Sequence, residues 1–257
     1  IAGFIGLVIG VISYHQMKDR PQVSLWSDIL SALQGELGAI TGQPTQGIFI
    51  AFEGGEGTGK STQSKLLAEW LEQEGETVLH TREPGGTNLG KELRQILLGH
   101  ETGEINPRAE ALLYAADRAH HVGSVIRPAL AKGEVVITDR YFDSSIAYQG
   151  AGRVLIPTEV ARINRWATET LYPTLTILID LPAVIGLGRL QSRDRLEAEP
   201  TEFHERVRQE FLQLALLDPE RYFVVDGTQT LQEIHEAIIA RVAELPALKR
   251  NAQSKEA

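Results

Sequence analysis

A glycine-rich segment that follows a short apolar run constrains this chain most. Residues 48–52 form a β-prone run, after which Gly54, Gly59, Lys60 and Ser61 fit the pattern G-x-x-x-x-G-K-[ST]. Glycines let consecutive backbone N–H groups converge on a phosphate, and a helix that begins there directs its positive end at the same point. The spacing therefore predicts a strand, a phosphate-binding loop (P-loop) and a helix, with a nucleoside triphosphate as the ligand.

Composition narrows the remaining possibilities. The chain has 257 residues, enough for one sizeable domain, and a formal net charge of -9. Because surfaces that follow nucleic-acid phosphates are usually basic, this charge argues against a nucleic-acid polymer as partner. The sequence contains no cysteine, which excludes disulfides, thiolate metal sites and thiol nucleophiles and fits a cytoplasmic location.

The first 47 residues are expected to form an extension outside the main domain. Residues 1–14 are apolar and uncharged but shorter than the roughly 20 residues needed to cross a bilayer. The chain also begins with Ile, so we interpret this run as the end of a membrane helix in a longer chain, with Lys18 and Arg20 on the cytoplasmic side. A buried helix or a signal-peptide core is the alternative. The proline- and glycine-containing residues 20–47 are interpreted as a linker.

From residue 48 onward, apolar runs alternate with helical patterns. This alternation predicts an α/β domain over 48–245, with a five-stranded parallel sheet covered by helices on both faces, followed by a polar tail over 246–257. The expected strands are 48–53, 77–81, 134–138, 174–180 and 222–226. The expected helices are 60–74, 88–98, 107–131, 157–170, 182–191, 202–217 and 230–244.

Arginine-containing segments follow several expected strands. Arg82 follows the second strand and Arg140 the third. Ligands of parallel α/β sheets bind beyond the carboxyl ends of the strands. The P-loop accounts for one nucleotide, so a second set of arginines at this edge indicates a second phosphorylated substrate, or else a water to be activated.

Five motifs, taken together and in order, resemble the thymidylate kinase family of P-loop NTPases. They are F-E-G-G-E-G-T-G-K-S-T, T-R-E-P-G-G, Y-A-A-D-R, D-R-Y-F-D-S-S-I-A-Y-Q-G and D-R-L-E, and the similarity runs from about Ile48 to Leu245. The resemblance implies transfer of the γ-phosphoryl group of ATP to dTMP, which gives dTDP and ADP. It also implies a Mg²⁺ requirement and a homodimer.

The resemblance assigns one group of residues to ATP and its metal. The P-loop contributes Gly54, Gly55, Glu56, Gly57, Thr58, Gly59, Lys60 and Ser61. Lys60 is expected to contact the β- and γ-phosphates, while Ser61 and Asp139 are the expected metal ligands. Glu56 is an unusual residue beside phosphate, and the matching acid in the family faces the dTMP sugar or its metal-bound surroundings. A solvated loop acid is the alternative.

A second group is assigned to dTMP. Its members are Arg82, Arg94, Tyr114, Arg118, Arg140, Ser144, Ser145, Tyr148 and Gln149. Arg82 and Arg140 are expected to hold the acceptor phosphate, with help from Arg94. Tyr114 and Arg118 lie four residues apart on a helix, so a ring that stacks on the base and a donor to thymine O4 share one face. A core tyrosine beside a surface arginine remains the alternative.

The segment around D-R-L-E matches the family's lid. It carries Arg189, Arg193 and Arg195, and the P-loop itself has no arginine. We expect Arg193 to stabilise the transferring phosphoryl group and Arg189 to stack on adenine. Asp194 and Glu197 are expected on the acceptor side. The catalytic set is therefore Lys60, Arg140, Arg193 and Glu56.

Three other functions fit the residues less well. A GTPase switch needs an N-K-x-D motif, and none of Asn88, Asn106, Asn164 and Asn251 precedes a lysine. A P-loop kinase for another acceptor fits less well, because paired arginines favour a monophosphate over a nucleoside. A regulatory domain without activity would not need Lys60, Ser61 and Asp139 together.

Overall fold

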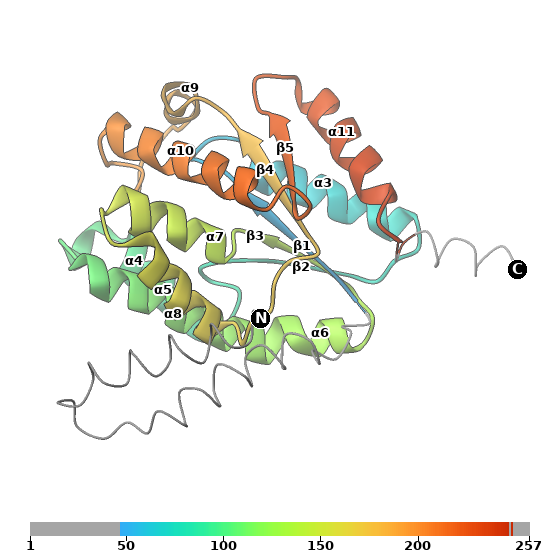
Figure 1. Ribbon diagram of the computed structural model, residues 1–257, viewed down its shortest axis with the longest axis horizontal. Helices are drawn as coiled ribbons and strands as arrows, with labels where there is room; N and C mark the ends of the chain where they lie inside the picture. The colour runs from blue at the N-terminus through green and yellow to red at the C-terminus, as the bar shows by residue number, and fades with distance from the viewer. Residues whose placement is uncertain (1–46, 247, 249–257) are drawn as a thin grey trace, which may run out of the picture. The chain divides into compact units, whose positions relative to one another are not determined.

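The computed structural model describes residues 47–246 and residue 248, which belong to a compact unit that spans Thr45–Ala257. Its centre is a parallel sheet with the strand order β2-β3-β1-β4-β5 (Figure 1). The strands are β1 (Ile48–Glu53), β2 (Val78–Arg82), β3 (Val135–Asp139), β4 (Leu175–Asp180) and β5 (Tyr222–Asp226). The predicted five-stranded parallel sheet is confirmed, and each predicted strand is within one residue of an observed one at either end.

One face of the sheet is covered by α3 (Lys60–Gln73) and α11 (Leu231–Ala243). Leu67 and Leu71 of α3, together with Ile238 of α11, pack against Ile50 and Ile177 in a buried apolar cluster. These strands are apolar on both faces, as expected where helices cover a parallel sheet on both sides.

The opposite face is covered by a long helical stretch and by further helices from before and after it in the chain. α5 (Pro107–His121) continues through a π-helical segment, Val122–Ile126, into α6 (Arg127–Ala131), which matches the single helix predicted for 107–131. Separate helices complete this side of the domain and its periphery. They are α4 (Asn88–Leu98), α7 (Phe142–Ser145), α8 (Pro157–Ala167), α9 (Ala183–Gly188) and α10 (Thr201–Leu217).

Three features of the helices differ from the sequence-based expectation. No helix is predicted directly after β3, but this segment forms α7 and a π-helical segment, Ile146–Gly152. The helix expected over 157–170 ends at Ala167 in α8. The helix expected over 182–191 ends at Gly188 in α9, after which the chain is irregular up to α10. Within this irregular segment, Arg195 is held by hydrogen bonds to Leu97 O of α4 and to Glu110 of α5.

Strand order places the P-loop next to the other motifs. In the parallel register, Phe52 of β1 pairs with Asp139 of β3, and Asp139 also pairs with Arg82 of β2. The loops after these three strands therefore emerge side by side, where ligands of such sheets bind. Among the described residues, none of the helices is both long and apolar enough to span a bilayer. The membrane interpretation of residues 1–14 falls outside the described part of the chain.

Candidate active site

The P-loop has the backbone conformation that its glycines permit. Gly54, Gly57 and Gly59 have φ values of 140°, 65° and 93°. A Cβ at Gly57 would lie 2.1 Å from the carbonyl oxygen of Gly186, so α9 packs directly on the loop. Lys60 begins α3, and its Nζ donates to Gly55 O at 2.5 Å and to Thr58 Oγ1 at 3.3 Å. Burial, together with the charge of Arg140, lowers the pKa of Lys60 to about 8.

The two predicted metal ligands are in contact. Ser61 Oγ, in the first turn of α3, donates to Asp139 Oδ2 at the end of β3. A hydroxyl and a carboxylate are hard oxygen ligands, and Mg²⁺ commonly binds through one or two protein oxygens plus substrate phosphates and water. The described residues contain no cluster of three His, Cys, Asp or Glu side chains suited to a metal. The donor set therefore fits a Mg²⁺ ion carried in with nucleotide phosphates.

Two adjoining cavities meet beside the P-loop. The first, of about 370 Å³, is lined by Gly57 to Thr62 of the loop and α3, together with Arg82 and Asp139. The second is lined by Tyr114, Arg118 and other side chains predicted to contact dTMP. Five described residues line both cavities: Glu56, Glu83, Arg94, Arg140 and Glu197. Two ligands bound in these cavities would therefore meet at one charged boundary.

Glu56, Arg140 and Tyr148 form the centre of that boundary. Arg140 NH2 donates to Glu56 Oε1 at 2.8 Å, and the Tyr148 hydroxyl donates to the same oxygen at 2.6 Å. Arg140 NH1 also donates to Gly54 O at 3.0 Å, which links the arginine to the P-loop. Burial favours the protonated acid, but the charges of Arg140 and Lys60 outweigh it and lower the pKa of Glu56 to about 2. Glu56 is therefore an ionised, bonded carboxylate and not a solvated loop acid.

Glu53 is a structural carboxylate that the sequence analysis missed. It is fully buried at the end of β1, where it accepts from Tyr141 N at 2.9 Å and from Ser144 Oγ at 2.5 Å. Burial and the nearby Asp143 raise its pKa to about 7. The segment it holds includes Arg140, whose φ is 72°. Glu53 thus fixes the turn that presents Arg140 to both cavities.

Arg118 lies at the bottom of the second cavity with most of its hydrogen bonds already made. Its Nε donates to Glu83 Oε2 at 2.6 Å, and its NH1 donates to Ser145 Oγ at 3.0 Å and to Asn164 Oδ1. Its NH2 donates to Tyr141 O at 3.2 Å. A guanidinium has five N–H groups, so one on NH2 remains for a ligand. The alternative interpretation of Arg118 as a surface arginine is excluded, because Arg118 is 1% exposed.

The other base-contact candidates also lie on this cavity. Tyr114 is on α5, while Ser144, Ser145, Tyr148 and Gln149 come from α7 and the π-helical segment after it. Gln149 Nε2 donates to Glu110 Oε1 at 3.0 Å, and Glu110 is fully buried. The sequence did not predict Glu83 and Glu110 as site residues, because acidic side chains normally lie on the protein surface.

The candidates for the acceptor phosphate differ in position. Arg94 lines both cavities, and its NH1 donates to Pro84 O at 3.1 Å. Arg82 is exposed and lines only the P-loop cavity. The structure therefore places Arg140 and Arg94 at the boundary between the two cavities, whereas Arg82 lies in the P-loop cavity alone.

The lid arginines are in three different environments. Arg195 Nε donates to Leu97 O at 2.8 Å and its NH2 donates to Glu110 Oε2 at 2.5 Å, so this side chain is fixed. Arg189 NH1 donates to Gly57 O at 3.2 Å, beside the P-loop. Arg193 is exposed, and within the described residues its guanidinium has no hydrogen-bond partner. Neither Arg189 nor Arg193 lines the two cavities. Asp194 and Glu197 both line the second cavity, and Glu197 also lines the first.

Comparison with known proteins identifies the family. The thymidylate kinase family model matches residues 52–238. A thymidylate kinase of Clavibacter sepedonicus is 57% identical over 199 residues, which cover 76% of this chain and 94% of that protein. One from Cutibacterium acnes is 52% identical over 199 residues, covering 77% and 98%.

A solved structure of thymidylate kinase from Ehrlichia chaffeensis superposes with a TM-score of 0.64 at 33% identity, covering 76% of this chain and 98% of that one. The chain therefore belongs to the thymidylate kinase family, the enzymes that phosphorylate dTMP with ATP.

Proposed function

We propose that ATP lies along the P-loop, that dTMP fills the cavity below Tyr114, and that their phosphates meet at Arg140. The observation that carries this arrangement is the set of five residues that line both cavities. Phosphoryl transfer between two anions is mainly a matter of positioning and charge neutralisation. The acceptor phosphate attacks directly, so no general base is needed to deprotonate a hydroxyl.

Each side of the reaction has its own residues. On the donor side, the P-loop amides and Lys60 hold the β- and γ-phosphates, and Arg189 lies beside the loop at Gly57 O. On the acceptor side, Arg140 and Arg94 hold the dTMP phosphate, while Arg118 and Gln149 contact the base. Tyr148, which donates a hydrogen bond to Glu56, lines the same cavity and is proposed to contact the dTMP sugar, between the base at Arg118 and the phosphate at Arg140. Arg193 closes over the transferring group when the lid moves.

Ser61 and Asp139 are proposed to hold Mg²⁺. When bound, the ion neutralises charge on the phosphates and orients them. We expect Asp139→Asn to raise the Mg²⁺ concentration for half-maximal activity by roughly 10- to 100-fold, the usual effect of losing an orienting carboxylate. A Mg²⁺ titration of steady-state rate measures this. Asp226→Asn, at the end of β5 in the same sheet, is the control, and an unchanged Mg²⁺ dependence in Asp139→Asn would contradict the assignment.

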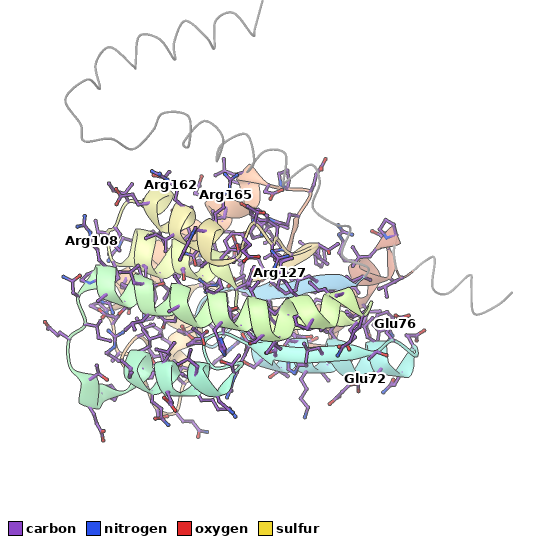
Figure 2. The ribbon with its side chains drawn as sticks, turned by 90° about the horizontal axis from the view of Figure 1, so that it is seen from below. Glu72, Glu76, Arg108, Arg127, Arg162 and Arg165 are labelled. Carbon is purple, nitrogen blue, oxygen red and sulfur yellow. The ribbon has the colours of Figure 1, made fainter. Side chains whose placement is uncertain are left out.

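A second copy of this chain is the proposed partner. Helices α5 and α8 lie side by side (Figure 2). They border an open groove of about 650 Å³ lined by Leu112, Ala115, Ile163 and Trp166. Leu112 is 56% exposed and Trp166 is 82% exposed. Glu159 and Arg162 lie on the same groove, and across a two-fold axis such a pair is self-complementary.

We expect the wild-type chain to sediment as a dimer at micromolar concentration and Trp166→Glu to sediment as a monomer, because a buried unpaired charge is costly. Leu231→Glu is the matched control, since Leu231 is 52% exposed at the start of α11, which covers the other face of the sheet. A monomeric wild type, or a dimer unaffected by Trp166→Glu, would contradict the proposal.

The absence of cysteine from the sequence supports a cytoplasmic location for the kinase domain.

A further inference from the structure

Glu110 is a buried carboxylate that the proposed chemistry does not use. It lies in the first turn of α5, has no exposed surface and accepts hydrogen bonds from three side chains. Arg153 donates through Nε and NH2 at 3.2 Å each, and Arg195 donates through NH2 at 2.5 Å. The third donor is the amide nitrogen of Gln149, at 3.0 Å from Oε1.

The two arginines fix the protonation state of Glu110. Burial alone would favour the protonated acid, but the hydrogen bonds and charge of Arg153, with those from Gln149 and Arg195, lower its pKa. Arg153 is itself held, since its NH1 donates to Glu199 Oε1 at 2.5 Å and its guanidinium lies 5.1 Å from the Phe203 ring centre. An ionised carboxylate can only accept hydrogen bonds.

This restriction fixes the orientation of the Gln149 amide. A glutamine amide has one end that donates and one that accepts, and only the NH2 end can face an ionised carboxylate. The carbonyl oxygen of Gln149 must therefore take the other direction, and no described group donates to it. Gln149 lines the base cavity with Tyr114 and Arg118. The cavity thus presents an acceptor from Gln149 beside a donor from Arg118.

We infer that Glu110 is a positioning residue that sets pyrimidine choice by fixing the Gln149 amide with its carbonyl oxygen toward the base. Thymine presents a donor at N3 and an acceptor at O4, which match these two groups. Cytosine presents the reverse, an acceptor at N3 and an amino donor at position 4. A buried polar group left without its partner is strongly rejected. The inference rests on the proposed contact between Gln149 and the base.

Glu110→Gln tests this inference because it keeps the size of the side chain and removes its acceptor-only character. The new amide can donate to Gln149, so the Gln149 amide can rotate and present its NH2 group to the base. The substrates to compare are dTMP and 5-methyl-dCMP, which differ only at positions 3 and 4 of the ring. We expect the ratio of their kcat/KM values to fall at least ~10-fold, the effect of one unmatched buried hydrogen bond.

Two variants separate this effect from a loss of structure. Glu110→Asp keeps an acceptor-only carboxylate, so its activity is expected to fall while the substrate ratio stays within about 3-fold of wild type. This limit lies below the ~10-fold change expected from one unmatched hydrogen bond. Glu199→Gln weakens the other carboxylate partner of Arg153 without touching Gln149 and should leave the ratio unchanged. If Glu110→Gln is too unstable to assay, a ratio lowered to the same degree in Glu110→Asp as in Gln149→Leu overturns the inference.

A Gln149→Leu variant separates failure of the inference from failure of the proposed base contact. If Gln149→Leu leaves the substrate ratio unchanged, Gln149 does not contact the base and both proposals fall. If Gln149→Leu collapses the ratio but Glu110→Gln retains it, the base contact stands and the role of Glu110 is wrong. A collapse in both, with Glu110→Asp and Glu199→Gln retaining the wild-type ratio, is the expected result.

Discussion

Arg193→Ala is expected to lower kcat at least ~10²-fold, because arginines that stabilise the transferring phosphoryl group are worth ~10³ to 10⁵ in rate. The P-loop contains no arginine, and Arg140 is already bonded to Glu56 and Gly54. Of the lid arginines, Arg195 is held by Glu110, whereas the exposed guanidinium of Arg193 has no partner within the described residues. The measurement is kcat and KM for both substrates by coupled ADP release.

Arg189→Ala is the matched control from the same segment. Arg189 contacts the P-loop backbone at Gly57 O and is proposed to stack on adenine, so its loss should raise the KM for ATP with little change in kcat. A kcat that stays near wild type in Arg193→Ala, or that falls further in Arg189→Ala, would reverse the assignment of the two residues.

Lys60→Ala is also expected to lower kcat at least ~10²-fold, the scale of losing one preorganised donor. Lys60 is 6% exposed, and its Nζ lies within the curve of the loop at Gly55 O. In the absence of nucleotide, burial and the charge of Arg140 lower its pKa to about 8. Phosphate oxygens would favour the charged form, so the interaction strengthens as charge develops on the donor.

Lys65→Ala provides the control on the same helix, because the side chain of Lys65 is 71% exposed and its one ion pair within residues 47–246 is with Glu69 at 3.7 Å. Pairs of this kind contribute roughly 0.3–0.5 kcal/mol, so activity and stability should stay near wild type. Equal losses in the two lysine variants would indicate a general effect of charge and not a contact with the transferring phosphoryl group.

The sequence predicted the parts of the fold that depend on local patterns. Strands buried on both faces are apolar throughout, as in Ile48–Glu53 up to its last residue. Three P-loop glycines, Gly54, Gly57 and Gly59, have positive φ values that other residues rarely adopt. The helix after β3 was missed because Phe142–Gly152 is held by tertiary contacts. Tyr141 N and Ser144 Oγ donate hydrogen bonds to Glu53 of β1, and no local spacing in the sequence predicts a contact of this kind.

The sequence predicted the site residues that belong to a motif. It did not predict the buried carboxylates that hold those residues through hydrogen bonds. Glu53, Glu83 and Glu110 are fully or almost fully buried, and each accepts hydrogen bonds from residues that lie 35 to 91 positions away in the sequence. A buried carboxylate is tolerated only with such partners. Because the partners come together only in the folded chain, the sequence showed Arg118 and Gln149 as candidates but not what orients them.

The most direct test of two nucleotides meeting at Arg140 is an acceptor panel. The full chain is assayed for ADP release with ATP, Mg²⁺ and dTMP, dUMP, UMP, dCMP or dGMP. We expect the highest kcat/KM with dTMP and a value at least ~10⁴-fold lower with dCMP and dGMP, as for sites that reject a substrate by unmatched hydrogen bonds. Similar rates with all five acceptors, or no ADP release beyond the ATP-only background when dTMP is added, would contradict the account.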